Sequence, residues 1–455
     1  MKSKNTNTNT GKQATDPAEL SPKNLNRRDF LRASGLVSLT GLGLFAGSGG
    51  LTPAKVFAQG KSEHGPEDIR LDSPVKSVIF INLAGGASHV DSFDPKPGNG
   101  PFKSINSSIR GVKVTDRLAK TAGALKHVSM IRSVYSEEGD HSRAQYLLHT
   151  GHRQMAGFRS QPSVGGVIAY AKQKSGPYFP EHITIGGRGG ISGDGGFLGV
   201  RFDSYHIGNV DRPLSNLTPR DRRLTEDRFY RREQILDAIN TSFAGRVSSE
   251  ETAVWSEMHE SALAFMNSEK LAVFDLKKEA AASRRRFGES RMGKALLMAK
   301  RLAAAEVPFI EITMGGWDTH NNNRDRVSKL LGELDGPVAA LINELKSSGL
   351  FDQTLFVLGS EFGRTPVIAG NGDGRDHHPR AWTMLMGGGK VPAGAVIGAT
   401  DDKGHKPTKD PAHVSSVVAT MYEAAGIDPQ AAVYTSQGRP MQLITKHQPI
   451  RGLVR

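Results

Sequence analysis

The sequence predicts an α/β fold of three layers, in which a mostly parallel β-sheet is covered by helices on both faces. Two observations support it: apolar runs of strand length end repeatedly in glycine, and segments with apolar residues at helical spacing alternate with them. The strands are apolar throughout, which indicates burial on both faces. The chain has 455 residues, of which 37% are hydrophobic, enough for one large domain with insertions or for two domains.

The expected elements follow one another along most of the chain. Strands are expected at 75–86, 128–135, 182–187, 307–313, 354–360 and 381–389, and helices at 289–306, 323–349 and 412–426. Ligands of such sheets bind beyond the carboxyl ends of the strands, so the loops that follow the strands are the expected place for a site.

Residues 1–58 form a separate N-terminal region. Arg27 and Arg28 precede a short, weakly apolar, glycine-rich stretch, and small residues end at Ala58 in a sequence suited to signal-peptidase cleavage. We expect a twin-arginine signal, recognition by the twin-arginine export machinery, and a periplasmic or extracellular location. An uncleaved membrane anchor is the alternative. The α/β domain is then expected to occupy residues 59–455.

Residues 188–290 differ from their surroundings, because a glycine-rich loop leads into charged helical segments with no clear strand. We expect a helical insertion or cap over the ligand-binding edge of the sheet.

The net charge is +13, of which residues 1–58 contribute +5, so the remainder carries +8. A basic surface attracts anionic ligands, but a solvated basic face on helices is the more common explanation of such charge. No zinc-finger spacing or RNA-binding aromatic motif is present, so nucleic acid is not an expected partner.

Four loops at expected strand ends carry His, Asp or Glu side chains. They contribute His89 and Asp91, then His141 and Ser142, then Asp318 and His320, and finally Glu361, Arg364, His377 and His378. The chain has no cysteine, so a metal must be held by imidazole, carboxylate, amide or backbone oxygen. Such ligands suit divalent ions such as Zn, Ca, Mg or Mn.

The expected metal ligands are His89, Asp91, Asp318, His320, Glu361 and one of His377 and His378. The last two are adjacent, so their side chains point opposite ways in an extended segment. Two ions about 4 Å apart would stabilise both oxygens of an in-line displacement. Simple structural roles remain open for single residues: Asp318 could cap the next helix, Asp91 a turn, and His141 could pack in the core.

Two arginines and a helix start are candidates for holding an anionic group. Arg143 and Arg364 could each pair bidentately with a phosphate or sulfate. A helix beginning near Ser142 would direct its positive end at the same anion. For His141 three roles stay open: nucleophile, general acid or base, and further metal ligand.

Several motifs resemble a known family. The segments "YLLHTGHR" (146–153), "GGWDTH" (315–320), "EFGRTP" (361–366) and "DHHP" (376–379) occur in the same order in a large secreted family built on domain of unknown function 1501. That family is grouped with the sulfatase-like and alkaline-phosphatase-like folds. The resemblance implies a metal-dependent, alkaline-phosphatase-like α/β/α fold.

The chain departs from the superfamily pattern at two places. Glu361 and Phe362 stand where a metal-binding Asp-His pair is usual. The sulfatase nucleophile position falls on His141 or Gly139, depending on the alignment, and Ser142 is the nearest hydroxyl. From the convergence of the four loops we expect an exported metal-dependent hydrolase of phosphate or sulfate esters, acting on an anionic small molecule or a glycan, although these two departures favour the alternative. The alternative is a non-catalytic anion- or glycan-binding protein on a hydrolase-like scaffold.

Overall fold

The structure is a computed structural model that describes residues 65–154, 161–174, 178–187, 194–215, 217, 226–244, 250–368, 372–435 and 437–454. The chain divides into two units, Met1–Gly49 with Ser215–Gly245, and Gly50–Leu214 with Arg246–Arg455. Described structure in the first unit includes helix α5 (Glu226–Ala244). The expected twin-arginine region, residues 1–58, lies outside the described residues.

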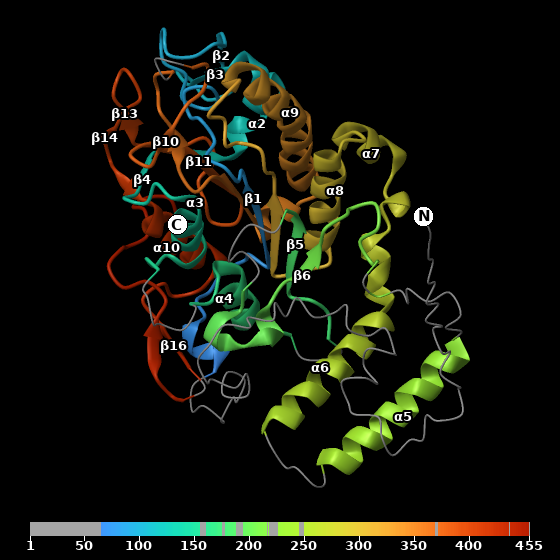
Figure 1. The fold of residues 1–455 in the computed structure, drawn as a ribbon. Coiled ribbons are helices and arrows are strands. Elements are labelled where there is room, and N and C mark those ends of the chain that lie inside the picture. Colours follow the sequence, from blue (N-terminus) through green and yellow to red (C-terminus); the bar gives the residue numbers. More distant parts are fainter. Residues whose placement is uncertain are drawn as a thin grey trace, which may run out of the picture. The chain divides into compact units, whose positions relative to one another are not determined.

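The second unit is built on a nine-stranded sheet with the order β12-β4-β11-β8-β1-β7-β5-β6, and β15 pairs with β4 (Figure 1). Its strands are β1 (Ser77–Asn82), β4 (Ser129–Tyr135), β5 (His182–Gly186), β6 (Tyr205–Ile207), β7 (Phe309–Thr313), β8 (Thr354–Gly359), β11 (Trp382–Gly387), β12 (Val396–Ile397) and β15 (Ala412–His413). Strand β11 runs antiparallel to β4 and β8, and the other pairs are parallel. The prediction of a mostly parallel sheet is confirmed.

Helices cover both faces of this sheet (Figure 1). The described helices of this unit are α2 (Ala119–Ala124), α3 (His141–Thr150), α4 (Val164–Ala171), α6 (Glu250–Met266), α7 (Ala281–Phe287), α8 (Arg291–Ala304), α9 (Asn323–Ser347) and α10 (Val414–Ala425). Helices α3, α4 and α10 pack against one another, and α2, α7 and α8 pack against α9. The predicted α/β layering is therefore confirmed, as are the six predicted strands and three predicted helices.

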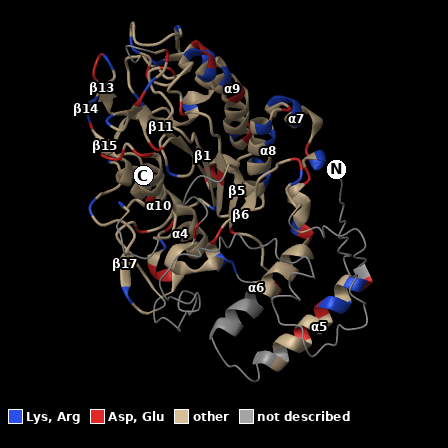
Figure 2. Ribbon diagram, viewed as in Figure 1, with Lys and Arg blue, Asp and Glu red and all other residues tan. Residues whose placement is uncertain are grey.

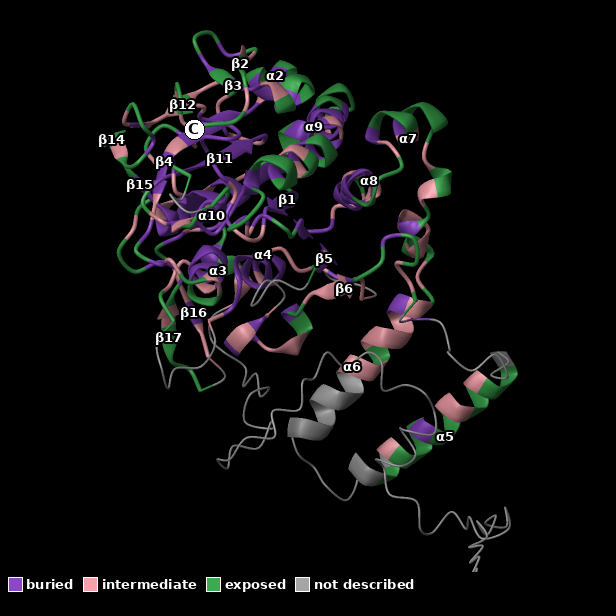
Figure 3. Ribbon diagram, turned by 45° about the horizontal axis from the view of Figure 1, so that its top comes forward, coloured by how far each residue is buried: buried purple, intermediate pink, exposed green. Residues whose placement is uncertain are grey.

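The strands are buried on both faces, as their apolar sequences require. Val78 and Phe80 of β1 belong to the core that contains α3, α4 and α10, while Ile79 and Ile81 alternate with them and are equally buried. Figure 3 shows the contrast with α9, which has one buried and one exposed face. Ser290 directly precedes helix α8 and caps it, because the Ser290 side chain accepts the Gly293 N–H.

The segment 188–290 contains one strand that the sequence did not reveal. Strand β6 extends the sheet by pairing with β5, but three residues are too few to show a period. The basic segment "SRRRF" (283–287) lies on α7, where the ribbon in Figure 2 is coloured blue for Lys and Arg. Small two-stranded pairs join β2 (Ser104–Asn106) to β3 (Lys113–Thr115), β9 (Gly363–Arg364) to β10 (His377–His378), β13 (Ala399–Thr400) to β14 (Pro407–Lys409), and β16 (Ala432–Tyr434) to β17 (Pro440–Gln442). Within the described residues, no helix combines the length and apolar character needed to cross a membrane.

Candidate metal centre

Helix α3 brings His141 to the carboxyl ends of the central strands. Asp140 caps the helix, since its side chain accepts the Arg143 N–H at 3.1 Å. Gly151 ends it in a left-handed conformation with φ 73°. His141 is the first helical residue, and its imidazole reaches the carboxylates of Glu361 and Asp318, which follow strands β8 and β7.

Two glycines after β1 make room for the loop that carries Asp318. Gly85 has φ +117°, and a Cβ there would lie 2.5 Å from the Asp318 backbone nitrogen. Gly86 has φ +86°, and its Cβ would lie 2.7 Å from the Phe362 ring. Only glycine tolerates both the backbone conformation and the close approach. The "LAGG" end of the first strand therefore holds neighbouring loops close together.

His377 reaches the site through strand pairing. Strand β10 pairs with β9, which places His377 opposite Arg364. The Nδ1–H of His377 donates to Gly139 O at 2.7 Å, and the Nδ1–H of His141 donates to Glu361 Oε1 at 2.8 Å. Both Nδ1 partners are oxygen acceptors, so we assign the proton to Nδ1 and a lone pair to Nε2 in each ring. His141 Nε2 is buried and has no hydrogen-bond partner among the described residues.

His320 is oriented in the same way. Its Nδ1–H donates to Asp376 Oδ1 at 3.0 Å, which leaves the Nε2 lone pair 3.1 Å from His377 Nε2. Two lone pairs at this distance repel unless a cation or a proton lies between them. The Arg364 Nη1–H also approaches His320 Nε2, at 3.4 Å. His320 is therefore a further candidate ligand beside the stronger pair of His141 and His377.

The separations between Asp318 and the three imidazoles are close to the edge lengths of a tetrahedral metal site. One oxygen of Asp318 lies 3.1 Å from His320 Nε2 and 3.4 Å from His377 Nε2, and the other lies 3.5 Å from His141 Nε2. A tetrahedron with metal–ligand distances of about 2.0–2.1 Å has edges of about 3.4 Å. Ligand atoms of His141, Asp318 and His377 lie within 4.8 Å of one another. Two or three imidazoles and one carboxylate suit Zn²⁺ and related divalent ions.

The protonation of these groups is set by their neighbours. The hydrogen bond to Glu361 raises the pKa of His141. Burial lowers the pKa of His377. Burial opposes the ionisation of Asp318, but the hydrogen bond and charge of Arg364 prevail and lower its pKa to about 2. A neutral imidazole and an ionised carboxylate are the states that bind a metal.

Arg364 does not present a free guanidinium to an anion. Its side chain is fully buried and donates to the backbone oxygens of Gly86 (3.1 Å) and Arg375 (2.9 Å), to Gly85 O and to Asp318 Oδ1. The expected bidentate contact with phosphate or sulfate would require these bonds to break. The structure gives Arg364 a different role, which is to hold Asp318 and the loops around it.

Asp91, an expected ligand, is turned away from the cluster. Its carboxylate forms two hydrogen bonds with Arg375, at 2.8 and 2.9 Å, and accepts the Asn323 amide at 2.9 Å. The side chains of Asp91 and Arg375 are both fully buried. The ion pair thereby supports the segment that leads to His377.

His89 and His378 also lie outside the cluster. His89 Nε2 donates to Gly404 O at 2.8 Å, and His378 Nε2 donates to His405 O at 2.8 Å. Their rings face each other with centroids 6.5 Å apart. His377 and His378 therefore point in opposite directions from β10, with His377 in the cluster.

Ser142 and Arg143, expected at the anion site, are exposed residues of α3. The Arg143 Nε–H donates to Glu138 at 2.9 Å. Asp140 already accepts the Arg143 backbone N–H at 3.1 Å. The capping carboxylate thus occupies the place where the helix dipole would attract a ligand anion.

A buried polar network beneath this cluster was missed from the sequence. His149 Nε2 lies 3.1 Å from Glu311 Oε1, and both side chains are fully buried. The Asn82 amide donates to Glu311 and to Gln145, each at 3.2 Å. The available signal was Glu311 itself, since a carboxylate inside the apolar strand "FIEIT" requires a buried partner.

Comparison with known proteins gives a family and a set of structural neighbours. Residues 75–454 match the family described as "Protein of unknown function (DUF1501)". No curated protein matches the chain.

The solved structures that resemble this chain do so at low sequence identity. One is Ps i-CgsB in complex with k-i-k-neocarrahexaose, with a TM-score of 0.39, 12% identity, and coverage of 78% of this chain and 72% of that one. Another is the phosphonate monoester hydrolase SpPMH from Silicibacter pomeroyi, with a TM-score of 0.36, 11% identity, and coverage of 78% of this chain and 74% of that one. A third is the alkaline phosphatase of the Antarctic bacterium TAB5, with a TM-score of 0.36, 12% identity, and coverage of 79% of this chain and 100% of that one.

Proposed function

This chain belongs to the DUF1501 family, and we propose that it is an exported, metal-dependent hydrolase that cleaves phosphate or sulfate esters on a small molecule or a glycan. One observation carries the proposal. Ligand atoms of His141, Asp318 and His377 lie within 4.8 Å of one another, and His141 Nε2 has no hydrogen-bond partner among the described residues.

The residues around this cluster support a metal site in a consistent way. His141, Asp318 and His377 would hold the ion, with His320 as a further ligand, and the ion would supply Lewis acidity and an activated water. Glu361 and Gly139 accept the Nδ1–H groups of the two main imidazoles and so direct their lone pairs inward.

The ion itself would draw an anionic ester to the site. A divalent ion and the Arg364 guanidinium would carry three positive charges, and Asp318, Glu361 and Asp376 carry three negative ones, of which Asp376 accepts the His320 Nδ1–H. With these charges balanced, a phosphate or sulfate oxygen would bind by coordinating the ion, which favours such esters over neutral or cationic substrates.

The adjacent histidines of β10 provide a matched test. We expect His377→Ala to lose bound metal and ester hydrolysis, while His378→Ala keeps both, because only His377 faces the cluster. Bound metal is measured by elemental analysis of the purified protein, and activity with a panel of aryl phosphate and aryl sulfate esters. Asp318→Ala should behave like His377→Ala, and a chelator should abolish the activity of the unaltered protein.

Two results would contradict the proposal. Equal metal content in His377→Ala and His378→Ala would remove the metal site. Metal binding without turnover of any ester would leave a metal-dependent binding protein. Export is tested separately, because replacing Arg27 and Arg28 by lysine should retain the protein in the cytoplasm if the twin-arginine route carries it.

A further inference from the structure

A cavity lies at the opposite end of the parallel strands from the candidate metal centre. Its wall includes Pro180 and Glu181, which come directly before β5, and Val307 and Pro308, which come directly before β7. The candidate ligand Asp318 instead follows β7. Helix α6 closes another side of this cavity, which has a volume of about 310 Å³.

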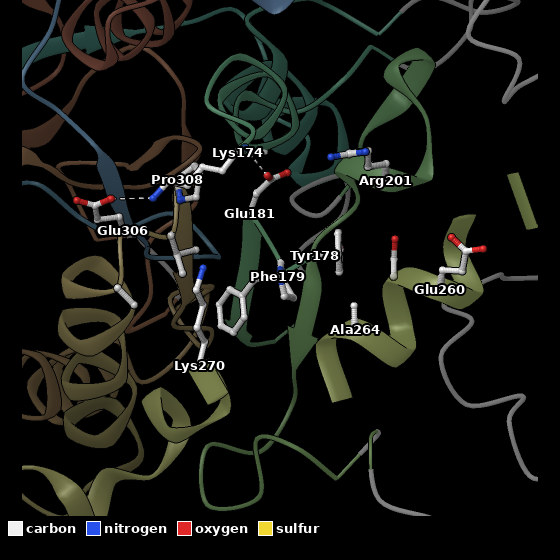
Figure 4. A pocket seen from close by; sticks show the side chains of 14 residues that line it. Lys174, Tyr178, Phe179, Glu181, Arg201, Glu260, Ala264, Lys270, Glu306 and Pro308 are labelled. Atoms are coloured by element: carbon white, nitrogen blue, oxygen red, sulfur yellow. Dashed lines mark hydrogen bonds and ion pairs between the residues drawn. The ribbon is translucent and has the colours of Figure 1, made fainter. Parts of the chain in front are cut away.

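Apolar and charged groups share the wall of this cavity (Figure 4). The Phe179 ring has Lys270 Nζ 5.7 Å from its centroid, and both residues line one side. Arg201 and Glu260 line the other side (Figure 4). Prolines, Val307 and Ala264 add a surface suited to the C–H face of a ligand.

The charges of the wall are balanced. Glu306 is neutralised within the protein, because Lys174 Nζ donates to it at 2.8 Å and Lys76 donates to its other oxygen. These two lysines lower the pKa of Glu306 to about 2. Counted together, the lining residues carry three cations (Lys174, Arg201 and Lys270) and three carboxylates (Glu181, Glu260 and Glu306), so their net charge is zero and favours a ligand of neither sign.

One acceptor of the cavity has no partner. Glu181 Oε1 accepts the Lys174 N–H at 2.9 Å, but Glu181 Oε2 is buried and has no hydrogen-bond partner among the described residues. Burial also raises the pKa of this carboxyl. The Lys270 ammonium makes no ion pair with a described residue, which leaves a donor as well. A ligand that both donates and accepts hydrogen bonds would satisfy both groups.

We propose that this cavity binds a neutral sugar unit of a glycan. Hydroxyl groups donate to Glu181 and Glu260 and accept from Lys270, while the apolar face of the sugar ring covers the proline and valine side chains. The cavity lies away from the candidate metal centre, so it acts as a separate anchoring site and does not depend on the proposed hydrolysis.

Calorimetric titration of the full chain with a panel of unsulfated hexasaccharides, built from glucose, mannose, xylose or galactose, tests this site. We expect at least one to bind. Glu181→Gln keeps the shape and the Lys174 contact but turns the free acceptor into a donor, so affinity should fall about tenfold. Glu260→Ala should also weaken binding, whereas Glu67→Gln, an exposed control outside the cavity, should not.

The two proposals can fail independently. Asp318→Ala should bind the sugar normally, and Glu181→Gln should hydrolyse small esters normally, whether or not the other proposal holds. Absence of binding to every unsulfated hexasaccharide at millimolar concentration would overturn the sugar site. Binding that is unchanged in both Glu181→Gln and Glu260→Ala would place the sugar elsewhere, and binding restricted to sulfated chains would show an anion site.

Discussion

Replacing Glu361 by glutamine isolates the contribution of its charge to metal binding. The carboxylate is 1% exposed and accepts hydrogen bonds from His141 Nδ1 (2.8 Å), Gly85 N (2.8 Å) and Ser360 Oγ (3.1 Å). Glutamine can keep its oxygen toward His141 and Gly85 and place its amide beside Ser360. The shape is conserved, and what changes is the charge that acts on the imidazole.

The size of the effect follows from that one bond. A hydrogen bond to a charged group stabilises by about 1.5–3 kcal/mol and a neutral one by about 1 kcal/mol, so the contact that orients His141 weakens by about 0.5–2 kcal/mol. Metal affinity at neutral pH should therefore fall about tenfold, the lower end of the range for the partners of metal-bound histidines. Titration against a chromophoric chelator measures it.

The pH dependence gives this prediction a second readout. Glu361 raises the pKa of His141, so protons compete with the metal at a higher pH in the unaltered protein than in the variant. The difference in affinity should consequently narrow as the pH falls through that pKa. Glu333→Gln, on the exposed face of α9, is the control. An affinity within twofold of the unaltered protein at all pH values would refute the role of Glu361.

Three further predictions concern the surroundings of the site. Asp91→Ala leaves the Arg375 charge buried and unpaired, so urea unfolding should show a loss of about 3–5 kcal/mol, and Asp91→Leu combined with Arg375→Met should recover most of it. His149→Gln tests the buried pair of His149 and Glu311. Burial opposes the charged imidazole, but Glu311 prevails and raises the pKa of His149. The stabilisation of the folded state by this pair is therefore full below about pH 6.5 and is lost as the pH rises through the folded-state pKa. The free energy of unfolding, measured well below and well above that pH, should differ less between the variant and the unaltered protein at the higher pH. Gly85→Ala puts a Cβ 2.5 Å from the neighbouring backbone at φ +117°, and should abolish metal binding while the helical circular dichroism stays unchanged.

The layering of the fold could be predicted because it depends on local patterns. Apolar strands buried on both faces and amphipathic helices between them specify a covered, mostly parallel sheet. What local patterns could not show was strand β6, whose three residues carry no period, and the antiparallel direction of β11. Direction and neighbour depend on how the chain crosses the sheet, which apolar content alone does not encode.

The candidate site was predictable only in part, for a related reason. The rule that loops meet at the carboxyl ends of strands brings Asp318, Glu361 and His141 together. The same rule applied to Asp91 fails, because the partner that draws it inward, Arg375, is 284 residues away. A carboxylate after a strand is either a ligand or half of a buried ion pair, and the distinction rests on a contact that no spacing reveals.

The orientation of the imidazoles at the candidate site also depends on contacts with neighbouring loops. An acceptor on one nitrogen of an imidazole fixes where the other nitrogen points, and for His141 and His377 the acceptors Glu361 and Gly139 O leave Nε2 facing Asp318. The next residue, His378, is also a histidine, but its Nε2–H donates to His405 O and its ring lies beside His89. The direction in which each ring is held, and not the mere presence of an acceptor, therefore distinguishes the candidate ligands, so a substitution at Glu361 should change metal affinity without altering any candidate ligand.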